Sequence, residues 1–164
     1  LKSLGEMRNL TEAAALAGVM VTGIASAAGR LLAPWMSDRI GRRNVLFVLY
    51  GITLICVLML TFAQSYLFIV LIALISFAFG GSAGVFPAIT ADYYGIKNNG
   101  INYGLVMIAF AVSGLLFPAI AKIVTIDGIP TAWTFIVPAV ASVIGIIVTF
   151  ALKKDKLAAN KKAD

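Results

Sequence analysis

Arg30 stands inside a run of small and apolar residues, where a permanently charged side chain requires an explanation. A guanidinium group offers a rigid planar fork that binds a carboxylate through two parallel hydrogen bonds. At a spacing of four residues, one helix face carries a small and polar stripe: Gly18, Thr22, Ser26 and Arg30. We therefore expect Arg30 to face a cavity and bind an anion, with Thr22 and Ser26 beside it. The alternative is that its long side chain extends along the helix to the nearest polar surface.

The acidic residues offer Arg30 no partner in the middle of an apolar run. All seven lie at or beyond the ends of such runs: Glu6, Glu12, Asp38, Asp92, Asp127, Asp155 and Asp164. An arginine within hydrocarbon costs at least ~2.5 kcal/mol on insertion scales, so it normally faces a partner or a cavity. A ligand that carries a carboxylate is therefore the expected counterion.

A second charged group follows in the segment SDRIGRRN. It combines one acid, one glycine and three arginines: Asp38, Arg39, Gly41, Arg42 and Arg43. An acid at a helix end forms ion pairs with arginines and interacts with the dipole of a neighbouring helix. Such ion pairs have to break when the helices rearrange, so the segment is predicted to be a gating loop.

Other kinds of site chemistry have few residues to use. Histidine is absent and Cys56 is the single cysteine, which leaves no Ser–His pair, no HExxH motif and no thiol cluster for a metal. The glycines 80, 81 and 84 lie within an apolar run, where they are better suited to close helix packing than to cradling a phosphate. We expect no metal, no cofactor and no enzymatic activity.

Composition identifies the elements that must position these residues. Hydrophobic residues make up 61% of the 164 positions and charged residues 12%, against about a quarter charged in soluble domains. Apolar runs long enough to cross a hydrocarbon core about 30 Å thick are predicted at residues 13–36, 45–63, 66–91, 101–123 and 133–152. A soluble chain of this length cannot bury five such helices. We therefore expect an all-α membrane protein with about five transmembrane helices.

The basic residues are divided unequally between alternate connections. One set of connections carries most of the thirteen: Arg39, Arg42, Arg43, Lys97, Lys153, Lys154, Lys156, Lys161 and Lys162. The other set carries only Lys2, Arg8 and Lys122. This is the positive-inside pattern of a membrane protein, not the basic patch of a nucleic-acid-binding protein. It predicts a helical bundle over residues 1–152 that starts outside and a cytosolic basic tail over residues 153–164.

The charged segment resembles the loop signature of the major facilitator superfamily. The spacing of that signature is matched by Asp38, Arg39, Gly41, Arg42 and Arg43. The family pattern usually begins with a glycine four residues before the acid, where this sequence has Pro34. We therefore expect the helices to pack less closely at Pro34.

Longer segments resemble the carboxyl-terminal half of the oxalate:formate antiporter and monocarboxylate transporter family: GRLLAPWMSDRIGRR, FAFGGSAGVFPAITADYYG and NNGINYG. The resemblance covers nearly the whole chain and implies helices eight to twelve of a twelve-helix fold. It implies that Arg30 binds the substrate carboxylate, with Ser26 one turn earlier in the same site. It also implies that Phe79 walls the pocket and that Phe110 replaces a second cationic ligand.

One remaining cation favours a small monocarboxylate such as lactate, pyruvate or formate, carried by alternating access across the plasma membrane. A dianion would leave its second charge poorly paired in a dry site, unless the missing amino-terminal helices supply a cation. The alternatives are a dicarboxylate exchanger of the oxalate/formate type and a drug or sugar carrier of the same fold. A membrane binding or signalling subunit that does not transport is the alternative from a different class. The expected partners are the anion, the lipid bilayer and the missing amino-terminal helices.

Overall fold

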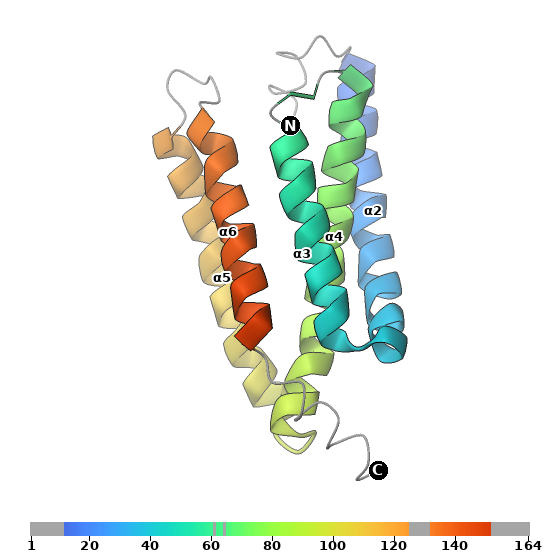
Figure 1. Cartoon of the computed structure of the whole chain (residues 1–164), viewed down its shortest axis with the longest axis vertical. Helices are drawn as coiled ribbons and strands as arrows, with labels where there is room; N and C mark the ends of the chain where they lie inside the picture. The colour runs from blue at the N-terminus through green and yellow to red at the C-terminus, as the bar shows by residue number, and fades with distance from the viewer. Residues whose placement is uncertain (1–11, 61, 64, 125–131, 152–164) are drawn as a thin grey trace.

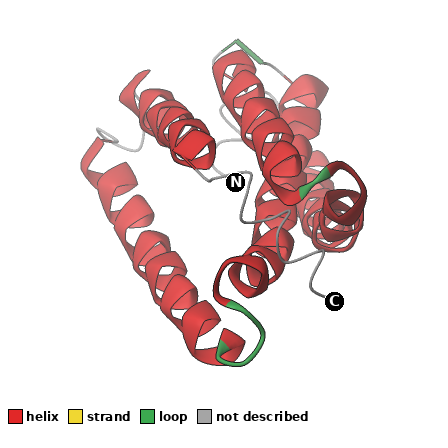
Figure 2. Cartoon of the chain, turned by 60° about the horizontal axis from the view of Figure 1, so that its bottom comes forward, coloured by secondary structure: helices red, strands yellow, loops and turns green. Residues whose placement is uncertain are grey.

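In the computed structural model, which describes residues 12–60, 62–63, 65–124 and 132–151, one helix covers most of each predicted apolar run. The run predicted at residues 45–63 ends early, because its helix stops at Leu60. The five helices are α2 (Glu12–Ile40), α3 (Arg42–Leu60), α4 (Ser65–Tyr94), α5 (Asn99–Val124) and α6 (Ala132–Ala151). They run roughly along one common direction (Figure 1), and the described part of the chain contains only helices and short connections (Figure 2). The expected all-α class is confirmed.

Most of these helices have the dimensions of membrane spans. Four described segments are long and apolar enough to cross a membrane: Leu16–Ile40, Arg42–Leu60, Tyr66–Tyr94 and Asn99–Phe117. The described apolar stretch of α6, Ile136–Phe150, is shorter than these four. The whole of α6 has 20 residues, and at 1.5 Å per residue it is about as long as a hydrocarbon core is thick.

The predicted gating loop is almost entirely helical, which corrects the expectation from the sequence. Helix α2 continues to Ile40 and α3 begins at Arg42, so Asp38 lies in the last turn of α2. Gly41 alone joins the two helices, with a φ of 93° that favours glycine over other residues. Its N–H donates to the carbonyl oxygen of Ser37 at 3.1 Å, which closes the last turn of α2. The charged side chains are therefore held on helix ends.

Helix α4 ends in the same way. It continues past the predicted boundary to Tyr94, so Asp92 lies in its last turn. Gly95 follows with a φ of 78°, and its N–H donates to the carbonyl oxygen of Ala91 at 2.8 Å. A glycine at this position caps the helix because it adopts the left-handed conformation without a steric cost.

Helix α4 is the centre of the packing. It packs along α2, which is its most extensive contact, and also against α3; α3 in turn packs against α6. Helix α5 contacts α4 and, less extensively, α6. Figure 1 accordingly shows α2, α3 and α4 close together.

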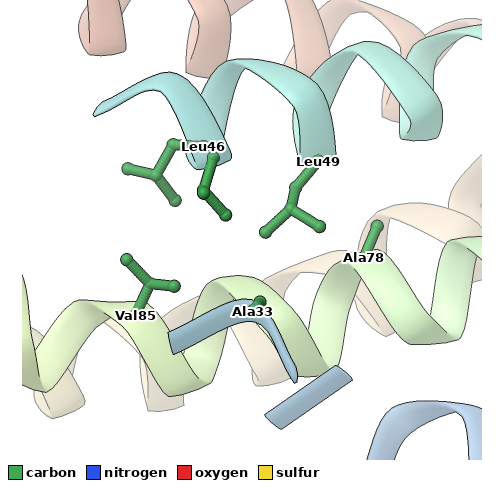
Figure 3. Close-up of a cluster of buried hydrophobic side chains, with 6 residues drawn as sticks. Ala33, Leu46, Leu49, Ala78 and Val85 are labelled. Atoms are coloured by element: carbon green, nitrogen blue, oxygen red, sulfur yellow. The ribbon is translucent and has the colours of Figure 1, made fainter. Parts of the chain in front are cut away.

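The hydrophobic core of the first three helices lies nearer to their charged ends. Its buried residues are Ala33 of α2, Val45, Leu46 and Leu49 of α3, and Ala78 and Val85 of α4. Figure 3 shows Leu46 and Leu49 directed toward Val85, Ala33 and Ala78. A second cluster, at the other end of α3, consists of Cys56, Ala63, Phe68 and Leu71. The single cysteine is therefore a packing residue.

Small residues let α2 and α4 approach until their backbones touch. A Cβ atom on Gly29 would overlap the carbonyl oxygen of Phe77 and lie 2.9 Å from the nitrogen of Gly81. Pro34 lies about one turn further along α2. A Cβ atom on Gly84 of α4 would lie 2.9 Å from the Cγ atom of Pro34. The expectation of less close packing at Pro34 is wrong, because the glycine that makes room stands on α4 instead of α2.

Candidate functional site

Arg30 lies on α2 with its side chain exposed on the described structure. Its backbone packs against Gly84 of α4, so the residue borders the contact between the two helices. Within the described residues, its guanidinium group makes no ion pair, hydrogen bond or ring contact. Within the described part of the chain, the guanidinium donors of Arg30 are therefore unused, and its backbone is held against α4.

The two hydroxyl residues of the predicted site differ in their hydrogen bonding. The hydroxyl of Thr22 donates to the carbonyl oxygen of Val19 at 2.7 Å, so its proton is used within α2. Ser26, one turn closer to Arg30, makes no hydrogen bond through its side chain in the described part. An anion needs donors, so Ser26 is the more suitable of the two to act with Arg30.

The two aromatic residues of the predicted site come together across α4 and α5. The ring centroids of Phe79 and Phe110 lie 5.4 Å apart, with the ring planes inclined at 33°. Phe79 is about half exposed, at 52%. Among the described contacts none joins this pair to Arg30, but Gly80, the residue after Phe79, packs against the backbone of Ser26. Helix α4 therefore connects the two parts of the predicted site, because it carries Phe79 and packs against the backbone of Ser26.

A charge cluster closes the ends of α2, α3 and α4. Arg42 is its centre: its Nη1 donates to Oδ1 of Asp38 at 2.9 Å and to the hydroxyl of Ser37 at 3.1 Å. Its Nε donates to the carboxylate of Asp92, which α4 contributes from its last turn. The Arg42 and Asp92 side chains are 19% and 30% exposed, whereas Asp38 is 64% exposed. The pair between Arg42 and Asp92 is thus the better shielded of the two.

The other two arginines of the signature have different contacts. The guanidinium carbon of Arg39 lies 4.2 Å from the ring centre of Trp35, one turn earlier on α2. Arg43 donates from Nη2 to the carbonyl oxygen of Phe150 at 3.1 Å, in the last turn of α6. Its guanidinium carbon also lies 5.1 Å and 5.4 Å from the rings of Phe150 and Phe47. Arg43 therefore joins α3 to α6, and of the described residues only Arg42 forms an ion pair with Asp38.

The sequence interpretation did not include Asp92, Ser37 and Phe150 among the site residues. Asp92 carried a signal, since it is an acid that precedes a helix-capping glycine at the same membrane side as Asp38. Phe150 carried none, because Arg43 contacts its main-chain carbonyl group, which every residue possesses. The basic tail, residues 153–164, lies outside the described residues. In the part searched for metal sites, no group of three or more His, Cys, Asp or Glu residues lies close together.

Comparison with known proteins agrees with this architecture. The chain matches the family model described as Major Facilitator Superfamily over residues 3–164. It is 32% identical over 111 residues to the uncharacterized MFS-type transporter YhjX of Escherichia coli (strain K12), which covers 66% of this chain and 28% of that protein. It is 30% identical over 142 residues to the oxalate:formate antiporter of Oxalobacter formigenes, covering 84% of this chain and 34% of that protein.

The matched part therefore spans about a third of the length of these two relatives. No solved structure matches the chain. The family match covers almost every residue, including all five helices and the charge cluster around Arg42. The chain belongs to the major facilitator superfamily.

Proposed function

We propose that the chain forms helices eight to twelve, in the carboxyl-terminal half of a secondary transporter for small organic anions, with a monocarboxylate such as lactate, pyruvate or formate as substrate. Transport would proceed by alternating access, in which two helical halves rock around a central site. Nothing in this proposal requires catalysis or a cofactor. The proposal concerns the whole transporter, and this chain supplies the anion-binding residues.

The observation that carries the proposal is the charge balance of the described residues. The two described aspartates, Asp38 and Asp92, both pair with Arg42. Arg30 lies eight residues before Asp38 on the same helix, a rise of about 12 Å. A guanidinium group in an apolar helix with no acid beside it can be neutralised by a bound anion, and its planar fork fits a carboxylate.

The neighbours of Arg30 favour one carboxylate over two. Ser26 adds an unused hydroxyl donor one turn away, whereas Phe79 and Phe110 present rings. A second carboxylate next to these rings would lose its hydration without gaining a partner, which is unfavourable. A dicarboxylate exchanger is the second candidate, because the relative named oxalate:formate antiporter is 30% identical to this chain.

We further propose that the cluster around Arg42 is the inner gate. It ties the end of α4 to the junction of α2 and α3, so these helices cannot separate while it is intact. Opening would break the pairs to both aspartates. The connections that carry most of the basic residues would lie on the cytosolic side of the plasma membrane. The tail at residues 153–164 would lie on the same side.

Uptake into proteoliposomes tests the proposal. Labelled lactate, pyruvate, formate and oxalate are offered to the full-length transporter, to Arg30→Gln and to Lys97→Gln. Lys97 is an exposed residue between α4 and α5 and controls for the loss of one positive charge. We expect saturable uptake of a monocarboxylate, reduced at least about 100-fold in Arg30→Gln, because losing the charged partner of a desolvated carboxylate costs several kcal/mol. We expect Lys97→Gln to behave as wild type.

Each rival function predicts a different result. A dicarboxylate exchanger would take up oxalate in preference to the monocarboxylates. A drug or sugar carrier would transport none of the four anions. If Arg30→Gln transports like wild type, Arg30 reaches a polar surface along the helix and the anion proposal is wrong. A binding or signalling subunit would show no uptake in any variant.

A further inference from the structure

Two glycines of α4 lie directly against the backbone of the two residues proposed to bind the anion. A Cβ atom on Gly84 would lie 2.8 Å from the carbonyl oxygen of Arg30 and 3.2 Å from its Cα. A Cβ on Gly80 would overlap the carbonyl oxygen of Ser26 and lie 2.9 Å from its Cα. Both pairs are spaced by four residues, so one face of α4 follows one face of α2.

The carbonyl group of Arg30 has a second unusual feature, which comes from Pro34. In a regular α-helix the N–H of residue 34 would donate to the carbonyl oxygen of residue 30. Proline has no N–H, and its ring crowds that carbonyl. The Arg30 carbonyl therefore has no regular helix donor, at the point where it lies close to Gly84.

We propose that Gly84 is a positioning residue for Arg30: together with Pro34 it fixes where the Arg30 backbone stands against α4, and so sets the affinity for the carboxylate. The inference rests on the proposed anion-binding function and assigns Gly84 no contact with the substrate. The contact joins backbone to backbone, so no side-chain rotation can relieve a Cβ at this position. A larger residue would displace α2 at Arg30 relative to Phe79.

The chain supplies a matched control. Gly23 is also a helical glycine, lies on the same helix as Arg30, and has nothing within 4 Å of an added Cβ. Replacing either glycine by alanine adds one methyl group and improves helix propensity equally. Only Gly84→Ala forces the two helices to move.

The experiment measures KM and kcat for the transported monocarboxylate in the full-length transporter carrying Gly84→Ala, Gly23→Ala or Arg30→Gln. The apparent Tm without substrate reports on folding. We expect Gly84→Ala to raise KM about tenfold at little-changed kcat, because small misplacements of a positioned group have effects of this order. We expect Gly23→Ala to match wild type.

A second variant, Pro34→Ala, changes the same contact and is used if Gly84→Ala folds poorly. Pro34→Ala restores the N–H donor to the Arg30 carbonyl and removes the ring atom beside Gly84, with a residue that favours helix. We expect it to change KM at least about threefold without lowering the apparent Tm, because the carbonyl turns back into the helix.

The outcomes separate the two proposals. If Arg30→Gln loses uptake while Gly84→Ala and Pro34→Ala keep the wild-type KM, the positioning role is wrong and the anion site stands. If Gly84→Ala lowers only kcat or the amount of folded protein, its role is structural and the inference is also wrong. If Arg30→Gln transports normally, the proposed function fails and the positioning role falls with it.

Discussion

At the scale of single residues, four arginines of one short segment have four different environments. Arg30 has no described partner, Arg39 stacks on Trp35, Arg42 pairs with two aspartates and Arg43 reaches another helix. The residue type is the same each time, so the difference lies in what the neighbouring helices bring to each side chain. The described contacts place the structural ion pairs at Arg42, whereas Arg30 makes none with the described residues.

Asp92 is expected to stabilise the fold more than Asp38 does. It is less exposed, 30% against 64%, so its pair with Arg42 is less weakened by water. We expect Asp92→Asn to cost about 1–2 kcal/mol and Asp38→Asn less than about 1 kcal/mol, measured as apparent Tm of the full-length protein in detergent. In an Arg42→Gln background the cost of Asp92→Asn should be smaller than in wild type. An Asp92→Asn effect of undiminished size in that background would contradict the pairing.

At the scale of helices, α4 lies at the centre of the packing and Arg43 connects α3 to the end of α6. Helix α4 contacts α2, α3 and α5, whereas α6 is attached mainly through α3. Arg43 lies in the first turn of α3 and donates to the end of α6. The rings of Phe47 and Phe150 meet edge to face beside it, with their centroids 5.5 Å apart. A cation at a helix C-terminus interacts favourably with the helix dipole.

Arg43→Gln is expected to loosen the end of α6. The substitution removes the cation from the Phe150 carbonyl and from both rings, interactions worth about 0.5–2 kcal/mol. We expect faster hydrogen–deuterium exchange in peptides that cover the last turn of α6. Arg39→Gln, which removes an arginine that stacks on Trp35, should leave that exchange unchanged. Equal exchange in both variants would show that Arg43 does not hold α6.

At the scale of the whole molecule, many large hydrophobic side chains of the described helices are exposed. Examples on α5 are Ile101 at 72%, Leu105 at 63% and Leu115 at 78% exposed. Such surfaces are stable only against lipid or against further helices, because neither contains water. This agrees with an integral membrane protein in which a bilayer covers what the described helices leave uncovered.

The positive-inside pattern predicts which ends face the cytosol. In a Cys56→Ala background, the test uses Phe62→Cys, between α3 and α4, and Lys97→Cys, between α4 and α5. Both positions are exposed, and they lie at opposite ends of α4. We expect a membrane-impermeant thiol reagent to label Phe62→Cys in intact cells and Lys97→Cys only after permeabilisation. The opposite labelling pattern would reverse the orientation.

The sequence by itself determined the class of protein and the five helices of the described part, because apolar length is a local property that the bilayer thickness selects. It also identified Arg30 as a candidate anion-binding residue, since a charge in an apolar run is visible without any structure. The helix boundaries were less accurate: α2 and α4 continue past their predicted ends to the capping glycines Gly41 and Gly95. These glycines were visible in the sequence, but their role in ending a helix depends on backbone conformation.

The tertiary structure alone decided which residues meet. The approach of Asp92 to Arg42, 50 positions earlier, and of Phe150 to Arg43, 107 positions earlier, depends on how three helices pack. The same holds for Pro34, where the expected loss of close packing is offset by Gly84 on another helix. Spacing along one helix predicts a shared face, but contacts between helices depend on the shape of both surfaces, which no single segment contains.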